Sequence, residues 1–241
     1  MIPAFLKKKL VVQENNIKLN EDFKTSSSIG IMQYLPDDIF WEIIRNSCVG
    51  FNDNDEVLGK IQAFNFWAHT DSHDTTNPNY VEPDVWIETD KCDIIIEAKV
   101  SDISGQHEGQ WRKEIQSILN ERGENAKIIL IALGGNENMF EGNILGFNVY
   151  KATWYDLLNS LVKEREKHNE NDFVCRIIDD VIELFARQGL MRIHWLGTMP
   201  IEEIDEQAIN TWAEIKELTG FSLLKTDIIN ENILQKWQPI N

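Results

Sequence analysis

The stretch from Glu82 to Val100 constrains the fold most, because it contains two short apolar runs on either side of a polar break. Val85–Ile87 and Ile94–Ile96 are rich in β-branched and aromatic residues, which favour β-strands. Thr89–Cys92, between them, has the polar composition of a tight connection, and Asp90 tolerates turn geometry. The stretch therefore predicts a β-hairpin.

The register of this hairpin decides where its charged side chains point. If the turn centres on Asp90 and Lys91, Asp84 lies opposite Glu97, and opposed side chains share a face with Cβ atoms about 5 Å apart. The strand period of two places Lys99 on that face as well. The apolar side chains of the hairpin point to the other face: Val85, Ile87, Ile94, Ile96 and Ala98. Because opposed like charges destabilise a buried strand, we expect a divalent cation to bind there and offset the repulsion.

These residues also form a recognisable short motif. Pro83-Asp84, followed by Glu97-Ala98-Lys99 on the second strand, resembles the signature of the PD-(D/E)XK nucleases, which have the restriction-endonuclease-like fold. The resemblance covers roughly residues 35–158. It implies an α/β fold of the α+β kind, with a mixed central sheet flanked by helices and, here, a helical C-terminal extension. It also implies a metal-dependent nuclease that hydrolyses phosphodiester bonds, with DNA as the expected substrate, in restriction, repair or defence.

The resemblance assigns roles to the residues of the motif. Asp84, Glu97 and the backbone carbonyl of Ala98 would hold Mg²⁺ or Mn²⁺, ions that suit oxygen ligands. Such an ion is expected to activate water and to stabilise charge on the scissile phosphate. Lys99 would orient that water or neutralise the developing charge. The alternative is that Asp84, Glu97 and Lys99 form an ordinary ion-pair cluster on a half-exposed hairpin.

A helix before the hairpin supplies a further acidic candidate. Pro36, Asp37 and Asp38 indicate the start of a helix that runs to Cys48 with helical periodicity. In the resembled family the first core helix often supplies an acidic residue that reaches the metal, and Glu42 is the candidate here. The alternative is a solvent-facing glutamate.

A helix after the hairpin, predicted over residues 106–121 from its apolar spacing, supplies an amide candidate. In many nucleases of this type a glutamine on this helix faces the active site. Gln110 is the first candidate and Gln106 the second. The tyrosine that usually follows four residues later is replaced by Glu114, which argues against the subgroup that carries the Gln–Tyr pair.

The remaining segments complete the predicted organisation of the chain. Residues 1–34 are expected to form an N-terminal arm with a loop at Thr25–Ser28, residues 35–165 the nuclease-like core, and residues 166–241 a mainly helical extension that packs on the core or binds a partner. Strands are predicted at residues 57–69, 127–133, 144–150 and 190–196, and helices at residues 153–163, 172–188 and 201–218.

The polar segment at residues 70–80 leads directly into Pro83-Asp84. His69, His73, Asp71 and Asp74 suggest a zinc site at first, but their spacing matches no closed tetrahedral pattern. We expect a solvated loop that, because of its position, contacts substrate rather than metal.

The balance of charge is unfavourable for a nuclease. The formal net charge is −17, from 23 Lys and Arg against 40 Asp and Glu, whereas phosphate backbones are bound through Lys and Arg. Either a local basic patch and metal ions bind nucleic acid, or the chain does not bind it alone. The alternative function is therefore a catalytically silent nuclease fold, or an acidic protein-binding or immunity protein that occupies a basic partner.

The cellular setting is predicted from what the sequence lacks. No apolar run is long enough to span a membrane, and the N-terminus does not have the order of charges of a secretory signal. Cys48, Cys92 and Cys175 are odd in number and widely spaced, which favours a reducing, cytoplasmic setting. The expected partner is nucleic acid, with DNA first; a protein partner or a homodimer is left open.

Overall fold

The apolar runs of the sequence form a mixed β-sheet with helices on both sides. The computed structural model describes residues 2–9, 12–13, 16–17, 20–51, 58–103, 105–135, 142–170 and 172–190. All of them belong to one compact unit, Met1–Arg192. The strand predicted at residues 190–196, apart from Leu190, and the helix predicted at residues 201–218 lie outside the described residues.

The main sheet has seven strands among the residues that the structure describes. Six of them run in the order β10-β11-β9-β8-β7-β4, and β3 also pairs with β11. The strands are β3 (Cys48–Val49), β4 (Ile61–Phe66), β7 (Val85–Thr89), β8 (Asp93–Ala98), β9 (Ile128–Leu133), β10 (Asn143–Ile144) and β11 (Phe147–Ala152). The pairs β8–β9 and β9–β11 are parallel and the other pairs are antiparallel. Every residue of β8 and β9 is buried, as expected of parallel strands at the centre of a sheet.

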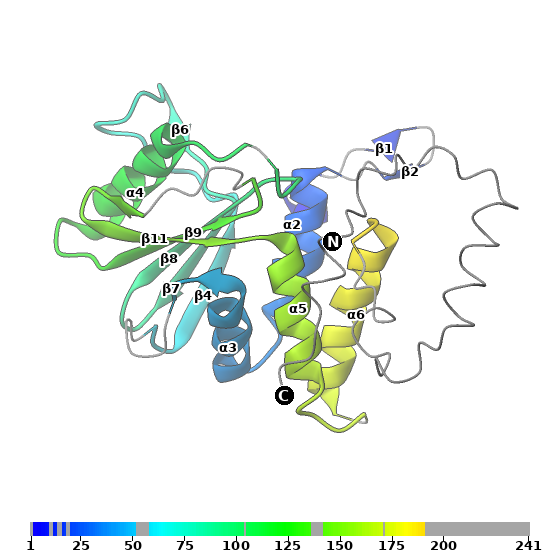
Figure 1. The fold of residues 1–241 in the computed structure, drawn as a ribbon. Helices are drawn as coiled ribbons and strands as arrows, with labels where there is room; N and C mark the ends of the chain where they lie inside the picture. The colour runs from blue at the N-terminus through cyan, green and yellow to red at the C-terminus, as the bar shows by residue number, and fades with distance from the viewer. Residues whose placement is uncertain are drawn as a thin grey trace, which may run out of the picture. The chain divides into compact units, whose positions relative to one another are not determined.

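The helices cover the two faces of this sheet (Figure 1). Helix α4 (Glu108–Arg122) lies on one face, and α3 (Asp37–Ser47) and α5 (Trp154–Arg165) lie on the other side. Helices α2 (Glu21–Met32) and α6 (Phe173–Arg187) pack against each other, and α6 also packs against α5. The short elements are α1 (Ile2–Leu6), the strand pair β1 (Val12–Gln13) and β2 (Asn16–Ile17), and the strand pair β5 (Thr70–Asp71) and β6 (Tyr80–Val81).

The predicted hairpin is confirmed, including its register. Strand β7 pairs antiparallel with β8, and Val85 lies opposite Ile96, which places Asp84 opposite Glu97. The turn is closed by Thr89, whose hydroxyl donates to the Cys92 carbonyl at 2.7 Å and accepts from the Cys92 N–H at 2.9 Å.

The alternation of side chains along the hairpin divides the core in two. The larger cluster contains the face predicted to be apolar, together with residues of α3 and α5: Val85, Ile87, Ile94, Ile96 and Ala98, with Phe40, Ile43 and Leu157. The smaller cluster lies under α4 and contains Ile95, Leu130 and Ala132 with Trp111, Ile115 and Ile118. Both faces of β8 are therefore buried, and its two charged residues, Asp93 and Glu97, lie near its two ends.

The expectation of a loop at Thr25–Ser28 is wrong, because these residues lie in the middle of α2 and are buried. The helix begins at Asn20, whose side chain accepts from the Phe23 N–H at 3.0 Å. The hydroxyl of Ser28 donates to the Lys24 carbonyl at 2.7 Å, and Ser26 accepts from the backbone N–H of Ala4 at 2.9 Å. Small hydroxyl side chains that hydrogen-bond to backbone groups allow close packing, and this packing overrides their weak helix propensity.

The other predicted elements form with modest changes of boundary. The predicted strand at residues 144–150 is a small hairpin, β10–β11, and the strand predicted at residues 57–69 is confined to β4. Thr153 caps α5 in a capping box with Asp156, and Asp172 caps α6. Cys48, Cys92 and Cys175 carry free thiols. None of the helices in the described part of the chain is long and apolar enough to cross a membrane.

Candidate functional site

Asp84 and Glu97 lie side by side at one end of the hairpin, as the register requires. Asp84 directly precedes β7, and Glu97 is the penultimate residue of β8. Both are almost fully buried, with 7% and 2% of their surface exposed. Burial raises the pKa of Asp84 well above its ordinary value, and the neighbouring charges of Glu97 and Glu21 raise it further.

The orientation of Asp84 is set by two hydrogen bonds. The indole N–H of Trp67 donates to Oδ1 at 3.1 Å, and the backbone N–H of Ala98 donates to Oδ2 at 2.9 Å. Trp67 is itself buried and follows β4, where its φ of 46° turns the chain out of the strand. Each carboxylate oxygen thus has one donor and retains a lone pair for a further ligand.

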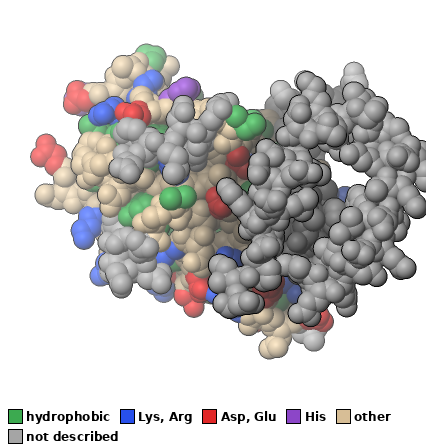
Figure 2. Space-filling view, in the orientation of Figure 1, with side chains coloured by type: hydrophobic (Ala, Val, Ile, Leu, Met, Phe, Trp, Pro, Cys, Tyr) green, Lys and Arg blue, Asp and Glu red, His purple; other side chains and the backbone are tan. Residues whose placement is uncertain are grey.

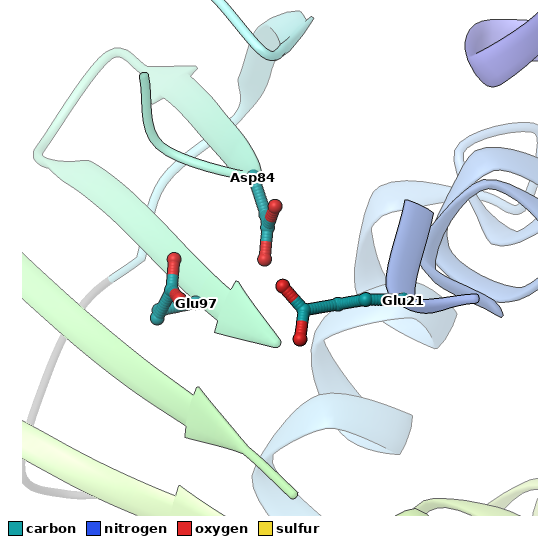
Figure 3. Close-up of side chains that lie close together, drawn as sticks. All are labelled: Glu21, Asp84 and Glu97. Carbon is teal, nitrogen blue, oxygen red and sulfur yellow. The ribbon is translucent and has the colours of Figure 1, made fainter. Parts of the chain in front are cut away.

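Helix α2 brings a third carboxylate to this pair. Glu21 is the first residue of α2, directly after the N-cap. Glu21, Asp84 and Glu97 each offer one oxygen, and these three oxygens lie within 4.8 Å of one another (Figure 3). Burial raises the pKa of Glu21, although Lys99 opposes this. Carboxylate oxygens are hard donors. Three of them that converge form a ligand set of the kind that Mg²⁺ or Mn²⁺ prefers.

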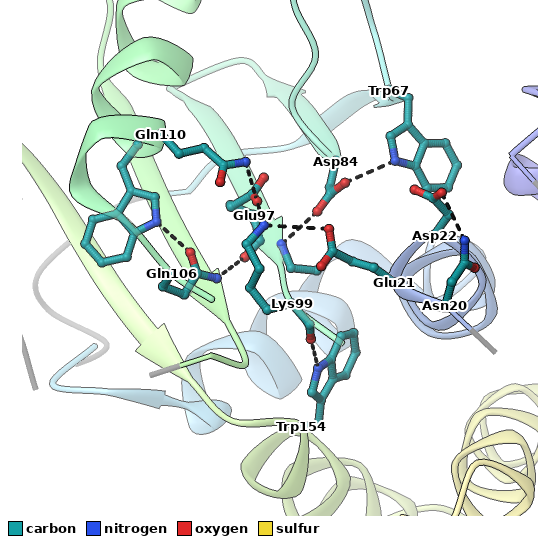
Figure 4. Close-up of polar contacts among 12 residues, drawn as sticks. Asn20, Glu21, Asp22, Trp67, Asp84, Glu97, Lys99, Gln106, Gln110 and Trp154 are labelled. Carbon is teal, nitrogen blue, oxygen red and sulfur yellow. Dashed lines mark hydrogen bonds and ion pairs between the residues drawn. The ribbon is translucent and has the colours of Figure 1, made fainter. Parts of the chain in front are cut away.

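Lys99 is the cationic neighbour of the three carboxylates. Its ammonium group forms an ion pair with Glu97 and lies 3.6 Å from an oxygen of Glu21 (Figure 4). Its side chain is only 14% exposed. Burial alone would lower the pKa of Lys99, but Glu97, Glu21 and Asp84 together raise it, so the group stays protonated at neutral pH.

The two glutamine candidates of α4 have different partners. Gln110 donates to Oε1 of Glu97 at 2.6 Å, so it contacts a carboxylate of the cluster. Gln106 donates to the backbone carbonyl of Glu97 at 2.9 Å and accepts from the indole N–H of Trp111 at 2.7 Å. The structure therefore places Gln110 at the carboxylates and gives Gln106 a bridging position behind them (Figure 4).

Glu114 is a fourth buried carboxyl group close to the cluster. It is 2% exposed and lies one helical turn beyond Gln110. Burial raises the pKa of Glu114 to about 8, and burial together with the charge of Glu114 raises the pKa of Glu97 well above its usual range. Within the described residues, its Oε2 atom is buried and has no hydrogen-bond partner.

The main chain around Lys99 is held from several sides. The Lys99 N–H donates to the Leu133 carbonyl at 2.8 Å, and the Lys99 carbonyl accepts from the indole N–H of Trp154 at 2.6 Å. Trp154 is fully buried and packs edge-on against Phe185 of α6, with ring centroids 5.8 Å apart. A Cβ on Gly134 would lie 2.8 Å from both the Lys99 carbonyl and the indole nitrogen, so this position requires glycine.

The structure does not bring Glu42 to the cluster. Its side chain is 47% exposed on α3 and forms an ion pair with Lys167. The acidic residue that a helix contributes is Glu21 from α2, one helix earlier in the chain than expected. The sequence signal for this helix was Asn20, an N-cap residue, followed by the acidic pair Glu21-Asp22. We did not predict it because the serine-rich run after it resembled a loop.

The segment predicted to lie beside the site is a small antiparallel pair, β5–β6, with the connection between its strands held on α4. The side chain of Asn120 donates to the carbonyls of Asp71 and His73 at 3.2 and 2.7 Å. Lys113 donates to Asn77 at 3.1 Å. Within the described residues, the group of side chains able to hold a metal does not include the histidines of this segment.

Comparison of the chain with protein-family models, with curated proteins and with solved structures finds no match. The case for a function therefore depends on the geometry and chemistry of the site.

Proposed function

We propose that the chain is a metal-dependent nuclease that hydrolyses phosphodiester bonds, with DNA as the first substrate to test. The observation that carries the proposal is the convergence of Glu21, Asp84 and Glu97 within 4.8 Å, beside the protonated Lys99. The order of Asp84, Glu97 and Lys99 along the hairpin resembles the PD-(D/E)XK signature. The mixed sheet with helices on both sides is compatible with a restriction-endonuclease-like fold.

The donor set fits Mg²⁺ or Mn²⁺. Glu21, Asp84 and Glu97 would hold the ion, and the Ala98 carbonyl remains a proposed ligand. The raised pKa values of all three carboxyl groups show that their negative charges are poorly compensated by the protein. A divalent cation would supply that compensation, and its binding would release protons. When bound, it would supply Lewis-acid chemistry at the scissile phosphate.

Other residues around the cluster would stabilise developing charge and hold the carboxylate ligands in position. Lys99 would place a positive charge where negative charge develops on the phosphate. Gln110 would hold Glu97 in its rotamer, and Trp67 would hold Asp84. Fixed donors around a carboxylate limit its movement, so the ligand geometry would exist before substrate arrives.

The net charge of −17 does not prevent local attraction of nucleic acid. On the face drawn in Figure 2, basic and acidic side chains are interspersed over the described residues. Close to the site, Lys99 is joined by Lys24, which lies 4.4 Å from the ring of Trp154 and donates to the Val100 carbonyl at 3.1 Å. The free thiols are compatible with action in the cytoplasm.

The proposal is tested by a plasmid-nicking assay with Mg²⁺, Mn²⁺ or EDTA. Asp84→Ala and Lys99→Ala should abolish cation-dependent cutting, whereas Glu42→Gln, a change outside the cluster, should leave it unchanged. Circular dichroism spectra of each variant would confirm folding. If the parent does not cut, or if either cluster variant cuts like the parent, the assignment is wrong. Saturable binding of a basic protein without cutting would favour the acidic binding protein instead.

A further inference from the structure

A cavity of about 360 Å³ lies beside the carboxylate cluster, between strand β6 and helix α4. Tyr80 and Glu82 line one side, and Gln110, Lys113 and Glu114 line the other. Because Gln110 also donates to Glu97, a single side chain connects the cavity to the cluster. Its volume is near the lower end of the range of ~300–1,000 Å³ that small-ligand sites occupy, so it suits one nucleotide and excludes a duplex.

One wall of the cavity carries a flat aromatic pair. Tyr80 is 43% exposed, and its ring stacks on His69 with centroids 3.7 Å apart and planes inclined by 12°. His69 lies 3.1 Å from an oxygen of Glu82, and Glu82 also forms an ion pair with Lys9. The ring of Tyr80 thus packs on the His69 ring, and part of it remains exposed to solvent.

The backbone under this pair is fixed as well. Tyr80 lies on β6, which pairs with β5, and the hydroxyl of Thr70 donates to the Val81 carbonyl at 2.9 Å. Asn77 donates to the Tyr80 carbonyl at 3.2 Å and accepts from Lys113 of α4. A platform that is already ordered loses little conformational entropy when it binds a flat ligand.

Lysines lie on both sides of the aromatic pair, and the acidic residues Glu82 and Glu114 line the first cavity together with Lys113. Lys113 lines the first cavity, and a second cavity of about 240 Å³ is lined by Lys7, Lys9 and His69. Glu82 lines both cavities, so it stands between them beside the stacked rings. Aromatic side chains for the bases, with lysines along the backbone, are the combination that binds single-stranded nucleic acid.

The geometry points to a nucleobase subsite: the cavity receives one unpaired base of the bound strand, stacked on Tyr80, with His69 as a positioning residue behind it. This inference rests on the proposed function, from which nucleic acid is taken as the ligand. A base inside a duplex has no free face for a side chain to stack on. The preferred substrate is therefore single-stranded or locally unpaired nucleic acid.

The test uses the full chain with Ca²⁺, which takes oxygen ligands, in place of Mg²⁺. The probe is a DNA oligonucleotide with one 2-aminopurine, whose fluorescence falls when the base stacks, presented as a single strand and as a duplex. The parent should quench the single strand strongly and the duplex little. Tyr80→Leu should weaken single-strand binding by about 5-fold to 150-fold, which corresponds to ~1–3 kcal/mol for one stacked base. Tyr80→Phe should bind like the parent.

The matched control is Tyr34→Leu. Tyr34 is 57% exposed and follows the C-terminal end of α2, roughly 18 Å of helix away from Glu21 at the other end. This variant should bind the single strand like the parent. His69→Ala should weaken binding less than Tyr80→Leu, because it removes only the ring that packs against Tyr80 and not the ring that stacks on the base.

The outcomes separate this inference from the proposed function. Parent binding without quenching, equal affinity for both probes, or unchanged affinity in Tyr80→Leu would overturn the subsite, even if the parent nicks plasmid with Mg²⁺. Tyr80-dependent quenching by a parent that never cuts would support the subsite and refute the nuclease. If the parent binds neither probe, the subsite is rejected.

Discussion

The indole N–H of Trp67 donates to Oδ1 of Asp84 at 3.1 Å, on the side of the carboxylate opposite the Ala98 N–H. A residue that directly follows β4 therefore sets the rotamer of an acidic residue that directly precedes β7. Since both residues are buried, loss of the indole donor leaves an unsatisfied oxygen and a carboxylate free to rotate.

Trp67→Phe should lower the free energy of unfolding by ~1–3 kcal/mol and weaken Mn²⁺ binding, because the lost donor costs both stability and ligand orientation. Trp86→Phe is the matched control, since the Trp86 indole donates to Asp93 at 2.8 Å, away from the cluster. It should cost similar stability and leave the Mn²⁺ affinity unchanged. Urea unfolding and calorimetric titration measure the two effects. Equal Mn²⁺ affinities in both variants would contradict the role given to Trp67.

Glu21→Gln should reduce the affinity for Mn²⁺ by about tenfold or more, because it removes one of three charged oxygen donors. Glu42→Gln should not change it, since Glu42 pairs with Lys167 on α3. Isothermal titration of the two variants and the parent compares two single-charge changes on neighbouring helices. A loss of affinity in Glu42→Gln alone would restore the original expectation for that residue.

Gln110→Ala should slow Mg²⁺-dependent cutting by about tenfold or more with a change in stability under ~1 kcal/mol, because its amide contacts a carboxylate of the cluster. Gln106→Ala should instead destabilise the fold by ~1–3 kcal/mol, because it removes two partly buried hydrogen bonds, one from the Trp111 indole N–H and one to the Glu97 carbonyl. Chemical unfolding and single-turnover cutting, measured on both variants, separate the two roles. If Gln106→Ala slowed cutting and Gln110→Ala lowered stability, the roles given to the two glutamines would be wrong.

Gly134→Ala and Gly50→Ala form a matched pair, because both glycines have a φ of 74°. The new Cβ at residue 50 would meet nothing within 4 Å, so only backbone strain of ~1–2 kcal/mol is expected. At residue 134 it would collide with the Lys99 carbonyl and the Trp154 indole, which adds ~1–3 kcal/mol. Urea midpoints of the two variants should therefore differ clearly. Equal midpoints would mean that the Trp154 indole and the Lys99 carbonyl can move apart to admit the new Cβ without loss of stability.

Without added metal, stability should fall as pH rises, because the folded state holds protons on buried carboxyl groups. The pKa of Glu114 rises from 4.5 to about 8 on folding. Its contribution is thus complete below pH 4.5 and is lost as pH rises towards 8. The unfolding free energy in EDTA, measured at several pH values over this range, should show this decline.

Glu114→Gln should make that pH profile flatter, since glutamine does not titrate. Asp84 and Glu97 have raised pKa values of the same sign, so part of the decline should persist in the variant. Added Mn²⁺ should reduce the decline in the parent, because the cation competes with protons for the carboxylates. A profile that is unchanged by Glu114→Gln would show that this group does not hold its proton in the folded state.

The local parts of this structure could be predicted from the sequence. The hairpin and its register follow from alternation and turn composition within a short stretch, so the juxtaposition of Asp84 and Glu97 was accessible before the structure. Gln110 was a candidate because the resemblance implies a glutamine at the site from the helix that follows β8, and helical spacing predicted that helix.

The third carboxylate could not be predicted in this way. Glu21 meets Asp84 only because α2 packs with α6 and begins at the end of the sheet, which is a tertiary arrangement with no local sequence signal. Glu114 was noted only as a departure from a motif, and its burial depends on how α4 lies on β8 and β9.

The edge-on contact between Trp154 and Phe185 links the last described helix to the Lys99 carbonyl. Helix α6 thereby supports the main chain beside the candidate metal site, although the carboxylates of that site come from other elements. A chain shortened ahead of α6 should consequently lose Mn²⁺ affinity at temperatures where its sheet is still intact, so any shortened variant of this protein should keep that helix.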